Sequence, residues 1–199
     1  MKKLKQFIFK TRAKKHFAKD IREKRFVNYE QAKTIIILFE SDYMEKNPFI
    51  KRIAEQFKAE GKKVSVWGFI DKKEVTSAIL SDYRILNKKS CDWSEQPNES
   101  FIREITESSY DLLIDLTKSE ILPLKYILLY SNVACKAGIN KYDENLLDFK
   151  LNISPQEELA QTEIIEDENS DESKVETLID EHYIFQNIFF YLKTIQSND

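Results

Sequence analysis

Glycine is scarce in this chain, with only Gly61, Gly68 and Gly138 among 199 residues. Loops that bind phosphate need glycine wherever the backbone must approach the ligand closely. The segment ESDYMEKNPF, which follows the first predicted strand, contains no glycine. Neither the glycine-rich turn of dinucleotide-binding proteins nor a P-loop can form there. This argues strongly against an ordinary dinucleotide enzyme and against a P-loop nucleotide hydrolase.

Histidine and cysteine are scarce as well, with two of each. His16 and His182 lie far apart, and neither has a cysteine or serine at the spacing of a zinc site or a catalytic triad. Cys135 lies in an apolar stretch, where a thiol behaves as a small core side chain. The acid Asp92 beside Cys91 raises rather than lowers the pKa of that thiol. We therefore expect no metal, no cofactor and no catalytic residue.

Long apolar runs are also missing. The longest stretches, such as Ile184–Leu192, fall short of the ~20 residues that a membrane-spanning helix needs. No uninterrupted apolar run or small-residue cleavage site follows the basic N-terminus, as it would in a signal peptide. An apolar fraction of 42% beside 33% charged residues is an ordinary globular balance that can bury a core. We expect a cytoplasmic protein with reduced cysteines.

What the chain has in abundance is segregated charge. The first 25 residues carry eleven Lys or Arg against Asp20 and Glu23, a local charge of +9, although the whole chain sums to −3. The run Ser154–Glu181 carries eleven acids against Lys174, a local charge of −10. Segregation this strong indicates an anionic partner that is reached through the N-terminus.

The basic segment is predicted to form a helix over residues 3–25, because no glycine or proline interrupts it and its residues favour helix. Phenylalanines alternate with its cations, so that lysine and arginine can contact phosphates while the rings stack on unpaired bases. The alternative is that the phenylalanines attach the helix to the sheet and the charges are only solvated. The predicted anion-binding residues are Lys2, Lys3, Lys5, Lys10, Arg12, Lys14, Lys15, Lys19, Arg22, Lys24 and Arg25.

The remaining chain alternates between strand and helix patterns. Continuous apolar runs at Thr34–Phe39, Lys63–Ile70 and Leu112–Leu116 are typical of strands buried in a parallel sheet. Further short strands are expected at Tyr83–Leu86, at Val133–Ala137 before Gly138, and at Leu147–Ile153. Helices are expected from Pro48 to Gly61, at Ser100–Glu107, at Ile121–Tyr130 and at Val175–Ile195.

These patterns predict an α/β fold with a doubly wound, Rossmann-like and mostly parallel sheet. The predicted divisions are a basic N-terminal helix (1–28), an α/β domain (29–153), an acidic linker (154–174) and a C-terminal helix (175–199). The broad apolar face of the last helix predicts that it docks on the α/β domain. The acidic linker is expected to be solvated and mobile.

Polar residues follow three of the predicted strands. In parallel sheets of this kind, ligands bind beyond the carboxyl ends of the strands. There the chain has Glu40 and Asp42, then Asp71, and finally Asp115 and Lys118, which together form the candidate ligand site. A carboxylate such as Asp115, which closes an apolar strand, can hold Mg²⁺ or orient a sugar hydroxyl. The alternative is that Asp115 caps the following turn, in which case Asp115→Asn leaves the function unchanged.

Two stretches carry resemblances to known families. The run KTIIILFESDYMEKNPFIKRIAEQFKAEGKKVSVWGFIDKKE, preceded by the lysine-rich helix, resembles an uncharacterised bacterial family known only as a domain of unknown function, over nearly the whole chain. The run YDLLIDLTKSEILPLKYILLYSNVACKAGINK is similar to the acceptor-side half of heptosyltransferase-like glycosyltransferases. There, a strand ending in Asp-Leu is followed by a helix, a short strand and a glycine. Because the chain has no room for a second nucleotide-sugar domain, this resemblance implies a binding remnant rather than a working transferase.

Three functions stay open at this point. The preferred one is a non-catalytic protein that docks onto RNA or a ribonucleoprotein through its basic helix, without sequence-specific DNA binding. The second is a small-ligand-binding or glycosyltransferase-like protein with its site at the strand ends, against which the missing glycines count. The third is a peripheral protein on an anionic membrane, against which the mixed faces of the basic helix count. The oligomeric state does not follow from the sequence.

Overall fold

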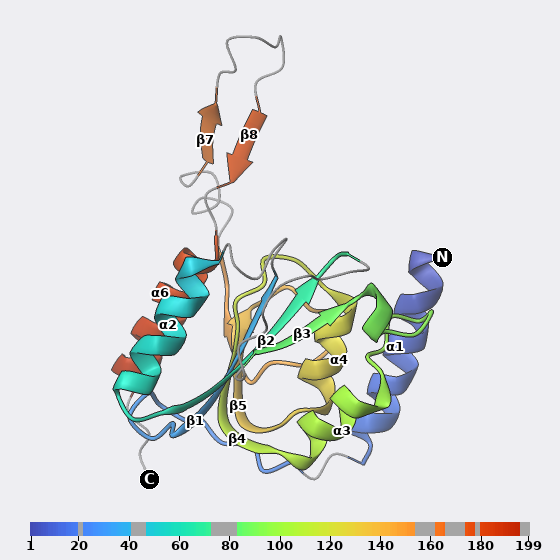
Figure 1. Cartoon of the computed structure of the whole chain (residues 1–199), viewed down its shortest axis with the longest axis horizontal. Coiled ribbons are helices and arrows are strands. Elements are labelled where there is room, and N and C mark those ends of the chain that lie inside the picture. Colours follow the sequence, from blue (N-terminus) through green and yellow to red (C-terminus); the bar gives the residue numbers. More distant parts are fainter. Residues whose placement is uncertain are drawn as a thin grey trace.

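A parallel β-sheet forms the centre of the protein (Figure 1). The structure is a computed structural model that describes residues 1–19, 22–40, 47–72, 83–153, 162–165, 174–177 and 180–195. Six strands pair in the order β3-β2-β1-β4-β5-β6, and every pairing is parallel. They are β1 (Thr34–Glu40), β2 (Lys63–Ile70), β3 (Tyr83–Asn87), β4 (Ser109–Asp115), β5 (Asn132–Ile139) and β6 (Phe149–Leu151).

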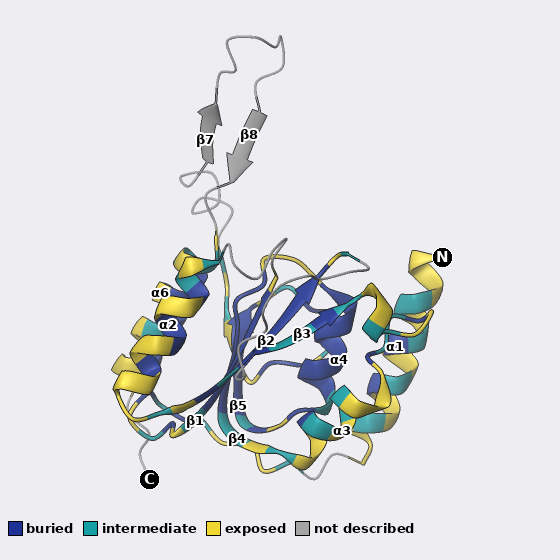
Figure 2. Ribbon diagram, in the orientation of Figure 1, coloured by how far each residue is buried: buried dark blue, intermediate teal, exposed yellow. Residues whose placement is uncertain are grey.

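Helices cover both faces of this sheet, which confirms the predicted doubly wound α/β fold. Two of them, α2 (Pro48–Ala59) and α6 (Glu181–Thr194), lie together on one face (Figure 1). The other face carries α1 (Lys2–Phe17), α3 (Glu99–Glu107) and α4 (Leu122–Tyr130). The strands between the two layers are therefore almost wholly buried (Figure 2).

The central strand β1 shows why both faces must be covered. Successive strand side chains point to opposite faces. Ile35 and Ile37 accordingly pack in the core with α2 and α6, whereas Ile36 and Leu38 pack in the core with α1, α3 and α4. A continuous apolar run of this kind is stable only between two layers, and for β1 the structure confirms that expectation.

The order of the strands creates a switch point at the centre of the sheet. The chain proceeds from β1 to β2 and β3 on one side, and then crosses to β4 and β5 on the other side of β1. Connections from the carboxyl ends of β1 and β4 therefore diverge, and such a divergence opens the crevice in which α/β proteins bind ligands.

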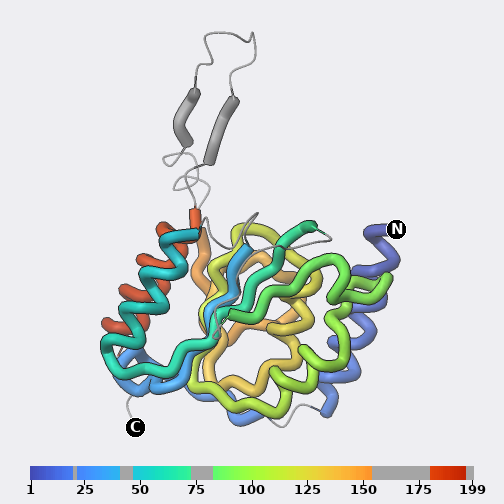
Figure 3. The backbone as a smooth tube through the Cα atoms, viewed as in Figure 1, coloured from blue at the N-terminus to red at the C-terminus, as the bar shows by residue number. Residues whose placement is uncertain are grey.

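The predicted helix over residues 3–25 is too long. Helix α1 ends at Phe17, and residues 22–28 have no regular secondary structure. The reason lies in packing, because Phe9 on α1 belongs to one core and Val27 to the other. A single straight helix cannot reach both faces, so the chain must pass around the edge of the sheet. The N-terminal and C-terminal helices consequently lie on opposite sides of it (Figure 3).

The predicted helix Val175–Ile195 also begins too early. Lys174–Thr177 is a strand, β8, which pairs antiparallel with β7 (Thr162–Ile165). Strand β7 lies inside the segment predicted as an acidic linker, and β8 lies at the start of the segment predicted as a helix. The last helix begins only after Asp180, whose side chain accepts a hydrogen bond from the Tyr183 N–H at 2.8 Å. Its docking is as predicted, because Ile184, Phe185, Ile188 and Leu192 are buried in the core with α2.

Two glycines lie where a side chain would be unfavourable, Gly61 because of its backbone conformation and Gly138 because of a close contact. Gly61 ends α2 as predicted, with a φ of 80°, a conformation that favours glycine. Gly138 does not end β5 as predicted but lies inside it, where a Cβ atom would be 3.1 Å from the Cβ of Asp115. Close contact with the neighbouring strand therefore explains this glycine.

Asp111 joins the beginnings of β1 and β4. Its Oδ2 accepts hydrogen bonds from the N–H groups of Lys33 and Thr34, both at 2.9 Å, and from the Thr34 hydroxyl at 2.8 Å. Partial burial alone would raise the pKa of Asp111, but these donors outweigh it and hold the pKa below its ordinary value. The charged carboxylate is therefore favoured in the folded state.

We predict that Asp111→Ala lowers the free energy of unfolding by about 2 kcal/mol at neutral pH, because it leaves several donors without an acceptor. A lowered folded-state pKa stabilises the protein above the ordinary aspartate pKa, and this contribution is lost as the pH falls through the lowered value. The difference between variant and wild type should therefore narrow below about pH 4. Denaturant titrations across pH, with Glu107→Ala as an exposed control, would contradict this if the difference were independent of pH.

Candidate functional site

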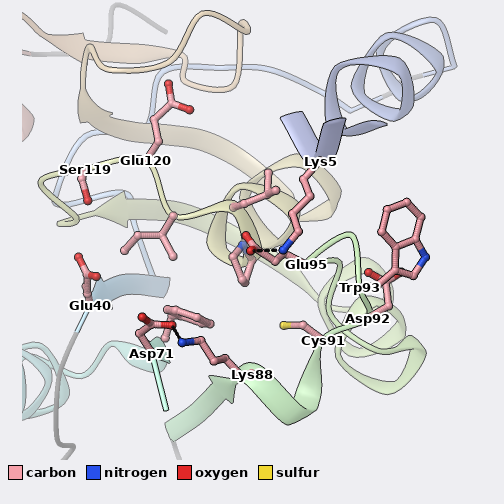
Figure 4. A pocket seen from close by; sticks show the side chains of 14 residues that line it. Lys5, Glu40, Asp71, Lys88, Cys91, Asp92, Trp93, Glu95, Ser119 and Glu120 are labelled. Atoms are coloured by element: carbon pink, nitrogen blue, oxygen red, sulfur yellow. Dashed lines mark hydrogen bonds and ion pairs between the residues drawn. The ribbon is translucent and has the colours of Figure 1, made fainter. Parts of the chain in front are cut away.

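A pocket of about 380 Å³ opens at the carboxyl edge of the sheet, on the side of β1 that leads to β2 and β3 (Figure 4). Glu40 at the end of β1, Asp71 after β2 and Lys88 after β3 line it. Ser119 and Glu120, which precede α4, close it from the β4 side. The pocket therefore lies at the switch point, where the fold alone predicts a ligand site.

The residues predicted at the strand ends separate into different environments. Glu40 and Asp71 line the pocket, and the Asp71 carboxylate pairs with the Lys88 ammonium at 2.7 Å. Lys118 is exposed and does not line it, and Asp42 lies outside the described residues. Asp115 is fully buried and away from the lining. Of the four predicted residues that the structure describes, Glu40 and Asp71 therefore meet in the pocket.

Asp115 belongs to a buried polar cluster. Its Oδ1 accepts hydrogen bonds from the Thr117 N–H at 3.0 Å and the Thr117 hydroxyl at 2.7 Å. Its Oδ2 accepts from the Tyr142 hydroxyl at 2.6 Å and pairs with the Lys141 ammonium at 2.9 Å. Burial and the Asp115 charge raise the pKa of Tyr142 well above its ordinary value. These contacts match the alternative that Asp115 holds the turn after β4.

The loop after β3 forms one wall of the pocket and presents Trp93. Asp92 Oδ1 accepts hydrogen bonds from the Ser94 N–H at 2.7 Å and the Gln96 N–H at 3.0 Å. Glu95 has a φ of 64°, the only positive value among non-glycine residues that the structure describes. Asp92 thus holds the loop by hydrogen bonds, with Glu95 in a backbone conformation that non-glycine residues rarely adopt. Trp93 projects from it and remains 67% exposed (Figure 4).

Two cations of the basic helix fasten this loop. The Lys5 ammonium pairs with Glu95 at 2.7 Å (Figure 4). The Arg12 guanidinium donates to the Ser94 hydroxyl and to the Tyr126 hydroxyl, both at 3.0 Å. Both residues were predicted to bind an external anion. The structure shows contacts of both inside the protein, and Lys5 makes the first helix part of the pocket wall. Anion binding by these two residues stays a prediction.

Other cations of the basic segment also have partners. Arg22, only 8% exposed, forms two hydrogen bonds to the Asp148 carboxylate at 2.7 and 2.8 Å. Lys10 pairs with Asp143 at 3.0 Å, and Arg25 lies 3.9 Å from an Asp111 oxygen. The exposed remainder forms no ion pair with another described residue. It consists of Lys2, Lys3, Lys14, Lys15, Lys19 and Lys24.

Glu181, at the start of α6, is a residue of this edge that the sequence did not indicate. Its carboxylate accepts hydrogen bonds from the Asn47 amide at 2.6 Å and from the Glu40 backbone N–H. Burial raises the pKa of Glu181, although these donors oppose the shift. The sequence carries no signal for it, because some 140 residues separate Glu181 from its partner Glu40.

The remaining chemistry of the described residues is limited. Cys91 lines the pocket, but burial raises the pKa of its thiol to about 11, and Asp92 contributes in the predicted direction. Its thiol is therefore protonated at neutral pH and a poor nucleophile. In the described part of the chain, no group of three or more His, Cys, Asp or Glu is placed to hold a metal. Within that same part, no helix is long and apolar enough to cross a membrane.

Comparison with known proteins gives one match. Residues 5–166 match the model of a family of unknown function, DUF6913. No curated protein and no solved structure matches. The predicted resemblance to an uncharacterised domain family is confirmed, and it brings no activity. The resemblance to heptosyltransferase-like proteins finds no match and stays a prediction.

We predict that Asp115→Asn destabilises the protein by about 3 kcal/mol, because it leaves the Lys141 ammonium without its buried counter-charge. Thermal or denaturant unfolding measures this loss. The matched control is Asp143→Asn, which removes a carboxylate from an exposed pair and should leave the midpoint unchanged. Equal stability of the two variants would contradict a structural role for Asp115. Adding Lys141→Met to Asp115→Asn should recover part of the loss.

Proposed function

The chain belongs to DUF6913, a family of unknown function, and we propose that it binds a small polar molecule with a flat ring in the pocket at the switch point. The observation that carries this proposal is the solvent-exposed Trp93 at the rim of a pocket of about 380 Å³. That volume lies within the range of small-molecule sites. The second function considered from the sequence is thereby preferred over the first.

The exposure of Trp93 needs an explanation. Tryptophan is among the most costly side chains to leave in water, because of its large apolar surface. A flexible loop would let the ring collapse onto the protein, but here the bonds of Asp92 and the Lys5–Glu95 pair hold the loop in shape. A ring held open in this way is prepared to stack on a ligand, without first being ordered by it.

The polar groups of the pocket suit hydroxyl and amino groups. Glu40, Asp71 and Glu120 supply carboxylate oxygens, and Ser119 supplies a hydroxyl. Carboxylates accept hydrogen bonds from sugar hydroxyls, and an indole ring packs on the apolar face of a sugar or on a base. A glycosyltransferase-like binding remnant, as the resemblance of residues 110–141 implies, falls within this proposal.

Binding rather than catalysis is proposed because the reactive groups are already committed. The Cys91 thiol is protonated, and the Asp115 carboxylate accepts three hydrogen bonds and an ion pair. A catalytic group needs a pKa near the working pH and a free path to the substrate. Neither Cys91 nor Asp115 meets these requirements.

Fluorescence provides a direct test, because the chain has two tryptophans and Trp67 is fully buried. A panel of sugars, nucleosides and amines is screened by thermal shift, and each hit is tested for protection of Trp93 against acrylamide quenching. We predict that Trp93→Ala weakens binding at least about tenfold, since base or ring stacking contributes about 1–3 kcal/mol. The unfolding midpoint should not fall, because the ring is exposed.

The control for this experiment is Phe190→Ala, which removes an aromatic ring that is 62% exposed on α6, on the opposite face of the sheet. It should leave binding unchanged. Hits whose affinity survives Trp93→Ala, or the absence of any hit in the panel, would contradict the proposal.

RNA docking remains a second candidate, favoured by the six exposed lysines of the basic segment that form no ion pair with other described residues. Phe7, 68% exposed on α1, offers a ring for stacking beside them. Because Arg12 and Lys5 hold the pocket wall, only lysines outside those contacts are suitable for a test. Lys3, Lys14 and Lys15 are exposed and lie on α1.

We predict that replacing Lys3, Lys14 and Lys15 together by Glu abolishes binding to single-stranded RNA without lowering the unfolding midpoint. Binding by the wild type should fall steeply between low and physiological salt through counterion release. Electrophoretic mobility shifts measure it, and flotation with anionic liposomes tests the membrane alternative. RNA binding that ignores salt, or that survives the triple change, would contradict this candidate.

A further inference from the structure

The lining of the pocket is predominantly anionic. Its negative groups are the carboxylates of Glu40, Asp71, Asp92, Glu95 and Glu120. Its positive groups are the ammonium groups of Lys5 and Lys88. Among the described residues that line the pocket, three formal negative charges therefore remain in excess. Glu40, Asp71 and Asp92 are exposed, so the attraction of these carboxylates for a cation is strongest at low salt.

The two lysines of the lining are not free to bind an anionic ligand. Lys5 is paired with Glu95 and Lys88 with Asp71, each at 2.7 Å (Figure 4). A phosphate or carboxylate would have to break one of these pairs and leave an acid uncompensated. Behind the lining, buried Lys125 pairs with Glu120 at 2.8 Å. If Lys125 is counted as well, the excess is still two negative charges.

One feature opposes this excess, namely the N-terminus of α4. Ile121, Leu122 and Pro123 line the pocket, so the positive end of the helix dipole lies beside it. That end amounts to about half an elementary charge, and Pro123 has no N–H to offer. Glu120, one residue before the Ile121 cap, already places a carboxylate near it. The partial positive charge at the start of α4 is therefore smaller than the excess negative charge of the described lining.

Trp93 adds a reason that is independent of the carboxylates. The face of an indole ring attracts cations more strongly than any other side-chain ring does. A ligand that stacks an ammonium or guanidinium group near Trp93 gains this attraction, whereas an anionic ligand loses it. We infer that the ligand of this pocket is a small organic cation, an amine or guanidine attached to a flat or apolar body. This inference rests on the proposed function and names its ligand class.

Three probes that share a phenol ring separate charge from ring stacking. Tyramine carries an ammonium group, tyrosol a hydroxyl group in the same place, and 4-hydroxyphenylacetate a carboxylate. Dissociation constants come from the shift of the Trp93 indole N–H signal in NMR spectra of the full chain. We predict that tyramine binds about tenfold more tightly than tyrosol at low salt, and 4-hydroxyphenylacetate most weakly. Added salt should reduce the advantage of tyramine.

A pair of matched variants locates the charge that is recognised. Glu40→Gln removes a negative charge from the lining and should weaken tyramine about threefold or more, with tyrosol unchanged. Glu55→Gln removes the same charge from the exposed surface of α2 and should change neither. Equal effects of the two variants on tyramine would overturn the inference.

The outcomes also separate this inference from the proposed function. If tyrosol or 4-hydroxyphenylacetate shifts the Trp93 signal at least as strongly as tyramine, the pocket binds small molecules but not cations, and the inference fails alone. If no probe shifts the signal, and the wider panel gives no hit, the proposed function fails and the inference fails with it.

Discussion

The burial of β1 on both faces is the constraint on which the rest of this structure depends. Each of its large apolar side chains contributes about 1.5–3 kcal/mol when it is removed from water. A sheet with this strand at its centre needs a helical layer on each side. The connecting helices supply part of each layer, and the first and last helices of the chain complete them. The position of α1 is thus a consequence of the burial of β1, although α1 is strongly basic and β1 is apolar.

Because of this constraint the basic segment has a structural role, covering the sheet, that its charge does not indicate. Phe9 and Ala13 attach α1 to the sheet layer, and the chain then passes to the opposite face, where the Tyr29 N–H donates to the Leu192 carbonyl at 2.9 Å. Along this path Lys5, Arg12 and Arg22 bond to the domain. For these three cations the structure shows attachment to the domain, and anion binding by the basic segment stays a prediction.

The sequence was sufficient for features that are written locally. The apolar runs of β1, β2 and β4 predicted the buried strands, and Pro48 and Gly61 predicted the bounds of α2. The sequence-based predictions were wrong where contacts between residues far apart in the chain determine the bounds of an element. Nothing near Phe17 stops α1 except the need to reach both cores, and Lys174–Thr177 has a partner strand that the acidic composition conceals.

The same division applies to the site. Glu40 and Asp71 were predictable, because the ends of parallel strands meet at one edge. Lys5 and Trp93 were not, because they reach the pocket from a helix before the sheet and from a loop after β3. For Asp115 the sequence left two alternatives open, a ligand residue or a cap of the following turn, because the buried ion pair with Lys141 depends on a contact that the sequence does not reveal.

The central claim is that this fold presents a pocket for a small organic cation, and native mass spectrometry of the full-length protein tests it most directly. The protein is purified under mild conditions from its own cells, and any bound molecule is then released by denaturation and identified by its mass. We predict that this molecule is a low-mass amine or guanidine. The amount should fall sharply in Trp93→Ala and remain unchanged in Phe190→Ala. Recovery of a phosphorylated or carboxylated molecule in a Trp93-dependent manner would contradict the account, as would a protein that carries no small molecule at all.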